Sequence, residues 1–522
     1  MFDLGRSFLG SVERSPDATA VVDGKLRLNY ADWMSRIGSL AGGLHSLGLR
    51  HGDHLLVVMQ NCWEMATLHW ACQFLGVIVT PLNWRVKADE IEYCALDADA
   101  CAIAYDAASA EAVAQSAACS RIPRVAVRKA ATGETATRDT PVGGWTVADM
   151  AFDDLLDASA PANLLNAKAE DWSVMLYTSG TTGKPKGVPR KHRVERAAAI
   201  AHVAQNLYSN GERTLGVMPL YHTMGVRSLL SMALVNGCFV CMQRFDAADA
   251  LKTIAREKIT HLYLVPTLYH DLLAHTEFPK ADISSVRRLG FAGAPMSEDL
   301  LRLLDGAFRP DIFVNHYGSS EVFTFTVDQA ATEKPGSAGR AGLSARIRVV
   351  KLGTESPDEL AAPAEEGEII ADLNGDEAFQ GYWKRADADA KALRHGWFFT
   401  GDTGYFDTDG DLYVTGRVDD MIISGGENIS PVEIESVLSL YPAVDEVAVA
   451  GLADERWGQK VVAFVKRKSA VDAATLDEHC KASTLLDFKR PREYVFVRDI
   501  PKSPVGKILR RKLIAGEYES ED

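Results

Sequence analysis

The stretch Tyr177-Thr-Ser-Gly-Thr-Thr-Gly-Lys-Pro-Lys-Gly-Val188 governs the interpretation of this chain. It follows the apolar run 172–176, which is typical of the end of a strand. Its glycines let the backbone approach a bulky anion closely, and its hydroxyl and ammonium groups supply hydrogen-bond donors to oxygens. The pattern therefore predicts a loop that holds phosphate groups.

Two other interpretations of this loop are weaker. A Walker loop requires G-x-x-x-x-G-K-[ST], but Gly183-Lys184 is followed by Pro185 and lacks the upstream glycine at that spacing. Clusters of Gly and Thr also occur in plain surface turns. The lysines on either side of Pro185 favour a phosphate-binding role over a surface turn.

Length and composition describe an acidic globular protein of more than one domain. At 522 residues the chain exceeds a single hydrophobic core, and its 47% apolar and 24% charged residues are ordinary for a soluble protein. The net charge of −15 argues against a nucleic-acid partner. An acidic protein that binds a polyanionic nucleotide must gather its cations locally. Lysines and arginines within motifs are therefore stronger candidates for nucleotide binding.

Cysteine usage and hydropathy indicate a reducing compartment and no membrane span. Cys238-Phe-Val-Cys241 has C-x-x-C spacing, but no second pair exists, so we expect buried strand cysteines in a cytoplasmic protein rather than a zinc ribbon. The beginning of the chain lacks the order of a signal peptide. Residues 65–84 carry no charge, yet their pattern predicts a helix over 65–75 followed by a strand over 77–82.

The order of predicted elements indicates an α/β fold. Strand-like runs alternate with helix-length segments over 54–105 and again over 213–265, which is typical of parallel sheets with helices on their faces. Residues 129–144 have no periodicity and indicate a solvated loop. After about residue 335, short strands and turns predict a small β-rich subdomain, and a compact α+β segment follows Arg417. We therefore predict a large N-terminal domain of mixed, mostly parallel sheets over 1–416 and a small C-terminal domain over 420–522.

Further short motifs follow the phosphate loop in a fixed order. Together they resemble the adenylate-forming superfamily of acyl-CoA synthetases, peptide-synthetase adenylation domains and luciferases. The resemblance spans essentially the whole chain from Leu28-Asn-Tyr30 onward, and over 416–435, 451–459 and 487–491 it is strongest to chlorobenzoate–CoA ligases. The motifs are Pro219-Leu-Tyr-His-Thr-Met-Gly225, Tyr317-Gly-Ser-Ser-Glu321, Thr400-Gly-Asp402, Gly416-Arg-Val-Asp-Asp420 and Pro501-Lys-Ser-Pro-Val-Gly-Lys507.

The resemblance implies a two-step, AMP-forming acid–thiol ligase that uses ATP, Mg²⁺ and coenzyme A. A carboxylate attacks the α-phosphate of ATP to give an acyl-adenylate and pyrophosphate, and the thiol of coenzyme A then displaces AMP. The first step brings two anions together, whose repulsion at ~3.5 Å and an effective dielectric of ~20 is roughly 5 kcal/mol per charge pair. Charge-assisted hydrogen bonds offset about 1.5–3 kcal/mol each, so several donors must converge.

The resemblance also assigns roles around the nucleotide. Lys507 would bridge the attacking carboxylate and the α-phosphate, Glu321 would hold Mg²⁺, and Asp402 would accept the ribose hydroxyls, with Arg417 nearby. Tyr317 would stack on adenine beside Gly293, Ala294 and Pro295, and Ser320 stands where the family commonly has threonine. The remaining implied nucleotide residues are Thr178, Ser179, Gly180, Thr181, Thr182, Gly183, Lys184, Lys186, Gly318 and Ser319, of which Thr178 is also a catalytic candidate.

Each of these residues has a plainer alternative. Glu321 fits a solvated carboxylate at a helix start, and Asp402 fits a turn aspartate. Lys507 lies in a basic tail of the kind that is usually exposed. Arg417 precedes two aspartates and fits a local ion pair, and Tyr317 fits core packing.

The resemblance further implies that the small domain is mobile and rotates about Asp419 within the hinge 417–419. One face would present Lys507, and the other would present the loop 424–428, with Gly425 and Gly426 lining a pantetheine channel. Water would be excluded from the adenylate until the thiol arrives. Trp457, Phe488 and Arg490 are candidates to stack on the adenine of coenzyme A, with an aromatic core as the alternative.

The segment Pro219–Gly225 bears on the identity of the acid. Amino-acid adenylators place an aspartate in this region, whereas this chain has His222-Thr223-Met224, so we expect a carboxylic acid other than an amino acid. Aromatic and thioether side chains around the acyl pocket suit a flat ring, as in benzoate. The polar side chains of His316 and Thr324 in the same wall suit hydroxybenzoate or furoate. The implied wall comprises His222 (also a catalytic candidate), Thr223, Met224, Phe291, Ala292, His316, Gly318, Phe323 and Thr324.

We therefore predict an aryl-CoA ligase of aromatic-acid degradation that activates a benzoate-like acid. Open alternatives are a short- or medium-chain acyl-CoA synthetase, an enzyme that loads a carrier protein, and a catalytically silent nucleotide-binding regulator. The sequence contains no H-E-x-x-H, G-x-S-x-G or G-x-G-x-x-G, which leaves metalloprotease, serine hydrolase and dinucleotide oxidoreductase functions without residues to perform them. The acid itself and a homodimer stay open.

Overall fold

The computed structural model describes residues 3–127, 150–161, 164–178, 184–483, 485–502 and 508–521. The chain forms two compact units, one of Met1–Ile347 with Ala371–Phe398 and the other of Arg348–Ile370 with Phe399–Asp522. The expected solvated loop over 129–144 lies outside the described residues. The single boundary near residue 417 and the hinge at Asp419 remain predictions.

The first sheet of the larger unit carries the phosphate-loop candidate. Its neighbouring strands are parallel except for the last pair, which is antiparallel. The helices α3 (Trp63–Leu75) and α4 (Ala88–Asp97) connect successive strands, as the alternating pattern predicted. The strand order is β7 (Met150–Ala151), β6 (Arg124–Val127), β5 (Ala100–Asp106), β3 (His54–Val58), β4 (Ile78–Leu82), β8 (Trp172–Thr178) and β9 (Lys186–Lys191).

The second sheet of this unit brings later motifs to one edge. Strand β1 and strands β10 to β14 form the parallel part of this sheet, so the carboxyl ends of β13 and β14 lie side by side. Helices α7 (His192–Gln205), α8 (Thr223–Leu234), α9 (Ala247–Glu257), α10 (Pro266–Ala274) and α11 (Glu298–Phe308) occupy the connections. The strand order is β16 (Arg340–Ala341), β15 (Thr326–Asp328), β14 (Ile312–Tyr317), β13 (Arg288–Ala292), β12 (His261–Leu264), β10 (Arg213–Gly216), β11 (Cys238–Cys241), β1 (Thr19–Asp23) and β2 (Leu26–Asn29).

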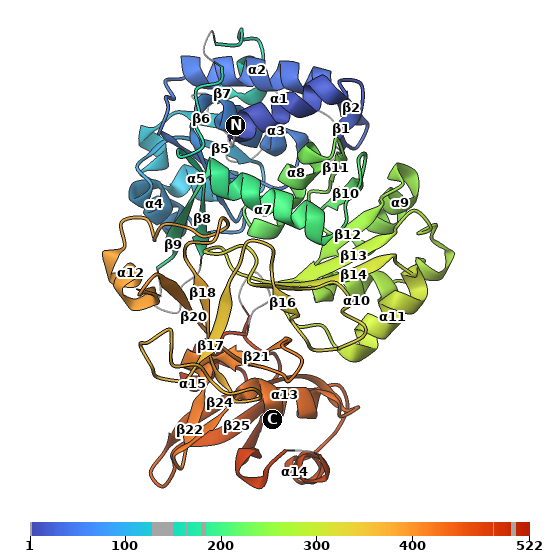
Figure 1. The fold of residues 1–522 in the computed structure, drawn as a ribbon, viewed down its shortest axis with the longest axis vertical. Helices are drawn as coiled ribbons and strands as arrows, with labels where there is room; N and C mark the ends of the chain where they lie inside the picture. The colour runs from blue at the N-terminus through green and yellow to red at the C-terminus, as the bar shows by residue number, and fades with distance from the viewer. Residues whose placement is uncertain are drawn as a thin grey trace. The chain divides into compact units, whose positions relative to one another are not determined.

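The uncharged segment 65–84 is buried protein core. Every residue of α3 is buried, and β4 follows it, which confirms the expected helix and strand. Helices α1 (Leu4–Arg14) and α2 (Tyr30–Ser46) pack with α3 near the N-terminus (Figure 1), where Phe8 contacts the rings of Trp33 and Trp70. Among the described residues, no helix is long and apolar enough to cross a membrane.

The cysteines of β11 behave as predicted. Cys238 and Cys241 are free thiols buried in the strand, and none of the chain's other cysteines forms a disulfide either. Burial raises the pKa of Cys238 to about 11, so its thiol stays protonated at neutral pH. These thiols act as small apolar core residues.

The smaller unit ends in the predicted compact α+β segment. Its sheet has the order β23 (Glu427–Ile429), β22 (Ile422–Ser424), β25 (Gly458–Arg467) and β24 (Val444–Asp454), with β26 (Glu493–Phe496) pairing β25. Helices α13 (Pro431–Ser439), α14 (Ala473–Ala482) and α15 (Arg510–Ile514) accompany this sheet. Ile434 of α13 and Leu476 of α14 are fully buried in its apolar core.

A further five-stranded sheet contains the Thr400-Gly-Asp402 motif. Its order is β17 (Ile347–Val350), β18 (Gly367–Asp372), β20 (Trp397–Phe406) and β19 (Leu393–Arg394), with β21 (Leu412–Arg417) pairing β20. Strands β20 and β21 form an antiparallel hairpin in which Asp402 lies opposite Arg417. These short strands match the predicted β-rich subdomain.

Candidate functional site

The phosphate-loop candidate joins two antiparallel strands. Strand β8 ends at Thr178 and β9 begins at Lys186, and these two residues pair with each other. The intervening candidates Ser179, Gly180, Thr181, Thr182 and Gly183 lie outside the described residues. The hairpin therefore fixes both ends of the loop, and the expected strand over 172–176 is confirmed.

Both lysines of the loop approach aromatic rings. The Lys184 ammonium lies 5.2 Å from the ring centroid of Tyr93, whose hydroxyl donates to the main-chain oxygen of Pro185 at 3.1 Å. The Lys186 ammonium lies 4.1 Å from the ring centroid of Tyr382. A cation over a ring face is attracted by the ring quadrupole. These contacts orient both lysines at the base of the loop.

The Tyr317–Glu321 motif forms a tight turn after β14. The main-chain N–H of Ser319 donates to the oxygen of Val322 at 3.0 Å, and the Ser319 hydroxyl accepts from the N–H groups of Glu321 and Val322 at 3.2 Å each. A Cβ on Gly318 would lie 1.9 Å from the main-chain oxygen of Phe323, so only glycine fits there. No helix begins in this described turn, and the alternative of a helix-start carboxylate for Glu321 is wrong.

The carboxylate of Glu321 is connected to Lys186 through Tyr382. Its side chain is 8% exposed, and Oε1 accepts a hydrogen bond from the Tyr382 hydroxyl at 2.7 Å. Among the residues that the structure describes, Oε2 has no hydrogen-bond partner. Because Tyr382 also lies against Lys186, one tyrosine contacts both the lysine and the carboxylate. A hard carboxylate oxygen of this kind fits Mg²⁺, which is usually bound through one or two carboxylates plus substrate phosphates.

The adenine candidates follow two adjacent strands. Ala292 at the end of β13 pairs with His316 in β14, so Gly293-Ala294-Pro295 and Tyr317 leave the same edge of the sheet. Gly293 has φ +84°, which favours glycine, and all three residues of this segment are exposed. The Tyr317 ring is half-buried and lies 5.0 Å from the ring of Phe325. Packing against the protein core therefore covers only part of the Tyr317 ring.

The acyl-wall candidates at the start of α8 are buried around a histidine cap. His222 precedes the helix, and its Nδ1 accepts from the N–H of Met224 at 3.3 Å. Thr223 and Met224 are buried, as are Phe291 and Ala292 in β13. Apolar and thioether surfaces therefore gather near the ends of β13 and α8.

Two wall candidates are engaged by the protein itself. The Nε2 of His316 lies 3.0 Å from the side-chain amide nitrogen of Asn206, and the His316 ring is 5.0 Å from that of His202. Burial holds the pKa of His316 well below its ordinary value, so the ring is neutral. The fully buried Thr324 hydroxyl accepts a 3.0 Å hydrogen bond from Arg227, a residue that the sequence analysis missed.

The ribose candidate Asp402 forms an ion pair with Arg417. The two side chains approach to 2.5 Å, and Arg417 also donates to the main-chain oxygen of Thr400 at 3.2 Å. Asp402 lies within β20, so the turn-aspartate alternative is wrong. Gly401 has φ +71°, and a Cβ there would lie 3.0 Å from the Arg417 guanidinium. Arg417 therefore pairs with Asp402, the other nucleotide candidate, and not with Asp419 or Asp420.

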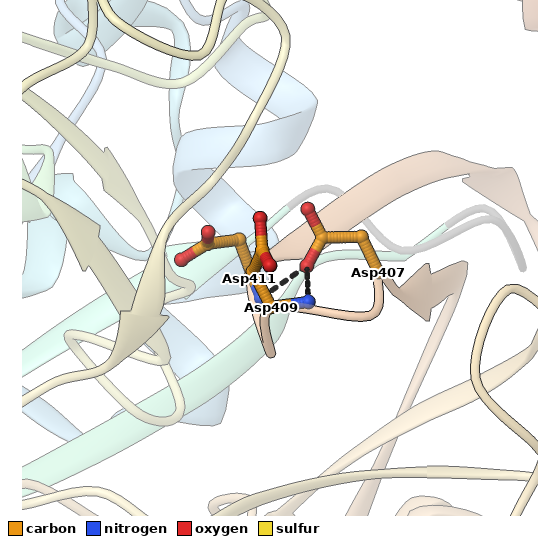
Figure 2. A group of neighbouring side chains, drawn as sticks. All are labelled: Asp407, Asp409 and Asp411. Atoms are coloured by element: carbon orange, nitrogen blue, oxygen red, sulfur yellow. Dashed lines mark hydrogen bonds between the residues drawn. The ribbon is translucent and has the colours of Figure 1, made fainter.

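Three aspartates of the β20–β21 hairpin form an acidic group that the sequence analysis did not single out. One carboxylate oxygen from each of Asp407, Asp409 and Asp411 lies within 4.8 Å of the others. Figure 2 shows that Asp407 Oδ1 accepts hydrogen bonds from the main-chain N–H groups of Asp409 and Asp411, at 2.9 Å each. This is the pattern of an aspartate that stabilises its own turn, and it accounts for the group as hairpin structure.

Two coenzyme A candidates meet in the smaller unit. Gly425 (φ +63°) donates its N–H to the main-chain oxygen of Trp457 at 2.8 Å, and a Cβ on Gly425 would lie 2.8 Å from the Trp457 ring. Gly426 (φ +88°) completes the turn. Phe488 is 38% exposed, so the aromatic-core alternative is wrong for it. The Arg490 guanidinium is engaged by Asp477 at 2.6 Å.

The hinge and tail candidates differ in what the structure describes. Asp419 lies in a short 3₁₀ turn over Val418–Asp420, and Lys507 lies outside the described residues. Arg510 in the basic tail is only 12% exposed and forms ion pairs with Glu435 and Asp420 at 2.7 and 2.9 Å. The expectation of an exposed basic tail is therefore wrong for Arg510.

Comparison with known proteins matches nearly the whole chain. The family model described as AMP-binding enzyme matches residues 8–383, and the AMP-binding enzyme C-terminal domain matches residues 433–507. A 4-chlorobenzoate–CoA ligase from Arthrobacter sp. is 32% identical over 96% of this chain and 93% of its own length. A long-chain-fatty-acid–CoA ligase from Mycobacterium tuberculosis is 31% identical over 94% and 93%.

A solved structure resembles the fold over the same range. The o-succinylbenzoate coenzyme A synthetase from Bacillus subtilis, in complex with ATP and magnesium ion, has a TM-score of 0.82 at 26% identity. The match covers 97% of this chain and 98% of that chain.

Proposed function

This chain belongs to the AMP-binding enzyme family, and we propose that it activates a benzoate-like carboxylate with ATP and Mg²⁺ and transfers it to coenzyme A. The coarser activity, that of an AMP-forming acyl- or aryl-CoA ligase, follows from the family and its relatives. The relatives include both an aryl and a fatty-acid ligase, so the aromatic acid is the proposed part.

The observation that best supports the proposed adenylation is that Tyr382 contacts both Lys186 and Glu321. Adenylation requires cations around a triphosphate and a metal on its oxygens. In this proposal Lys186 and the N–H groups of the loop bind phosphate oxygens, and Glu321 holds Mg²⁺. The ion, when bound, would neutralise charge on the phosphates while the acid approaches phosphorus.

Other residues position the substrates. Tyr317 and Gly293 would contain the adenine, and Asp402 would exchange its ion pair with Arg417 for the ribose hydroxyls. Met224 and Phe291 would bound the acyl ring, which supports a flat apolar acid. Lys507 would complete adenylation, and Gly425 with Trp457 would guide the pantetheine arm in the second step.

Carboxylate-dependent exchange of pyrophosphate into ATP tests this proposal. The panel comprises benzoate, hydroxybenzoate, chlorobenzoate, furoate and aliphatic acids of increasing length. We expect exchange with aromatic acids and thioester formation when coenzyme A is added. Exchange confined to aliphatic acids would overturn the aromatic assignment, and ATP binding without exchange for any acid would favour the silent regulator.

A further inference from the structure

Strand β9 carries a buried arginine immediately after the phosphate loop. Arg190 is 0% exposed and follows the buried residues Val188 and Pro189 in the strand. Burying a guanidinium is costly unless its charge is paired and its donors are satisfied. The partners of Arg190 therefore indicate why the charge is there.

The donors of Arg190 converge on the turn that carries Glu321. Its Nε donates to Glu195 Oε1 at 2.5 Å, which pairs the charge. Its Nη1 donates to the main-chain oxygens of Ser320 at 2.8 Å and Glu321 at 3.3 Å. Its Nη2 donates to the main-chain oxygen of Glu377 at 3.0 Å. One side chain thus connects the strand that leaves the phosphate loop to the backbone of Glu321.

The same turn is supported by stacking. The guanidinium carbon of Arg190 lies 3.7 Å from the ring centroid of Phe323, and that of Arg227 lies 4.2 Å from it. The main-chain oxygen of Phe323 packs against Gly318, which leaves no room for a Cβ. Phe323 therefore transmits the position of the two arginines to the turn between Gly318 and Phe323.

A second buried carboxyl group, that of Glu377, lies within the electrostatic influence of both arginines. Glu377 is 0% exposed, and burial raises the pKa of its carboxyl while the positive charges of Arg227 and Arg190 oppose that shift. Glu377 also lies close in sequence to Phe379, whose N–H donates to the main-chain oxygen of Glu321 at 2.9 Å. The buried side chains Arg190, Glu195, Arg227 and Glu377 form what we call the buried charge group.

Stability alone is a poor account of this group. Replacing a buried ion pair with apolar residues of similar volume is often neutral or stabilising, so a purely structural role could be met by an apolar core. What an apolar core could not supply is directional donors to the carbonyls of Ser320 and Glu321. Those carbonyls set the direction in which the Glu321 side chain leaves the backbone.

We propose that Arg190 is a positioning residue that fixes the Glu321 carboxylate relative to the phosphate loop, through hydrogen bonds to the main chain of Ser320 and Glu321. This inference rests on the proposed role of Glu321 as the holder of Mg²⁺. Residues that orient a metal ligand commonly change metal affinity by 10- to 100-fold when they are altered.

The double variant Arg190→Met, Glu195→Leu separates positioning from stability. Its apolar pair removes both buried charges together, so its thermal midpoint should exceed that of Arg190→Met alone. Calorimetric titration with ATP is carried out once in the presence of Mg²⁺ and once in the presence of a chelator. The comparison measures metal-dependent binding of ATP without turnover. We expect a Kd for ATP raised about 10-fold in the presence of Mg²⁺, and changed less than about 2-fold without the metal. A folded double variant with wild-type affinity in both conditions would overturn the proposal.

Two further variants guard against a folding defect and a general charge effect. Arg190→Lys keeps the charge but lacks the planar fork of donors, and we expect a rise of at least about 3-fold in the Kd with Mg²⁺. Arg27→Met breaks the bidentate pair that Arg27 forms with Glu257 in the same unit, in which both contacts are 2.7 Å. This variant should leave the difference in ATP affinity with and without Mg²⁺ unchanged. Wild-type protein whose ATP affinity does not respond to Mg²⁺ would instead contradict the proposed function of Glu321.

Discussion

The hydroxyl of Tyr382 donates a 2.7 Å hydrogen bond to Glu321, and the ring of the same tyrosine lies 4.1 Å from the Lys186 ammonium. The hydrogen bond orients a carboxylate, and the ring face attracts a cation. These two effects can be separated by substitution, because phenylalanine keeps the ring and loses the hydroxyl.

Tyr382→Phe should weaken the response to magnesium while leaving the position of Lys186 intact. We expect the Mg²⁺ concentration for half-maximal pyrophosphate exchange to rise about 10-fold, since an outer partner of the metal ligand is lost. Titrating exchange against Mg²⁺ at saturating acid checks this. Tyr413→Phe, which retains the stacked ring beside Tyr405, is the matched control and should behave as wild type.

Lys186→Met should reduce ATP affinity by removing a charged donor from the base of the loop. A charge-assisted hydrogen bond contributes about 1.5–3 kcal/mol, which corresponds to a rise in Kd of roughly 10- to 100-fold. Calorimetric titration with ATP measures this. Lys280→Met removes an exposed lysine that pairs with Glu277 at 3.2 Å, and an equal loss there would argue against a specific role for Lys186.

Gly318→Ala should disrupt the turn that carries Glu321. The new Cβ would lie 1.9 Å from the oxygen of Phe323, so the backbone must move. We expect a lower thermal midpoint together with loss of exchange activity. Gly306→Ala in α11 meets nothing within 4 Å and should instead stabilise by about 0.5–1 kcal/mol. An unchanged Gly318→Ala protein would show that the turn is more adaptable than its packing indicates.

Acid should destabilise the protein through two buried histidines. Burial lowers the pKa of His54 and His192 to about 4, whereas unfolded histidine has a pKa of about 6.5. The unfolded chain therefore takes up protons first, and the stability contribution is complete above about pH 6.5 and lost as pH falls toward 4. Between pH 7.5 and 5 we expect the free energy of unfolding to fall by about 2 kcal/mol per histidine.

Urea unfolding at several pH values measures this slope. His54→Gln keeps a polar group next to Thr80, which lies 2.9 Å from His54 Nδ1, but cannot titrate. Its slope between pH 7.5 and 5 should be shallower than that of the wild type by the contribution of one histidine. Identical slopes would mean that His54 takes up its proton over the same pH range in the folded protein as in the unfolded chain.

Lys507→Ala should separate the two half-reactions. The resemblance places this lysine on the adenylation face alone, so the variant should lose pyrophosphate exchange by orders of magnitude yet convert supplied acyl-adenylate to thioester. The measurement is thioester formation from synthetic acyl-adenylate and coenzyme A. Equal loss of both half-reactions would contradict the predicted division between the two domain faces.

The sequence predicted the elements well because their patterns are local. The switch from a helix over 65–75 to a strand over 77–82 follows from periodicity and from Gly76, which adopts φ +75° at the helix end. The motifs that contain Thr178 and Glu321 likewise lie at a strand end and in a turn, and Asp402 lies within a hairpin strand. Short-range signals were sufficient for these parts.

The supports of the site were missed because they act across long distances in sequence. Tyr382 is 61 residues from Glu321, and nothing in its own neighbourhood signals a carboxylate partner. Arg190 appears in sequence as one more basic residue beside Lys191, yet its acceptors Ser320 and Glu377 are 130 and 187 residues away. Burial of a charge is a property of the assembled sheets and cannot be inferred from local pattern.

One thiol in β5 offers a practical handle on this enzyme. Cys101 is exposed, whereas every other cysteine of the chain is buried. Partial loss of solvent around the sulfur atom and the nearby carboxylates raise the pKa of the Cys101 thiol, so maleimide coupling should proceed best in mildly alkaline buffer. A single fluorophore can thus be attached to the natural protein without first removing other cysteines, and its emission can then be followed during turnover.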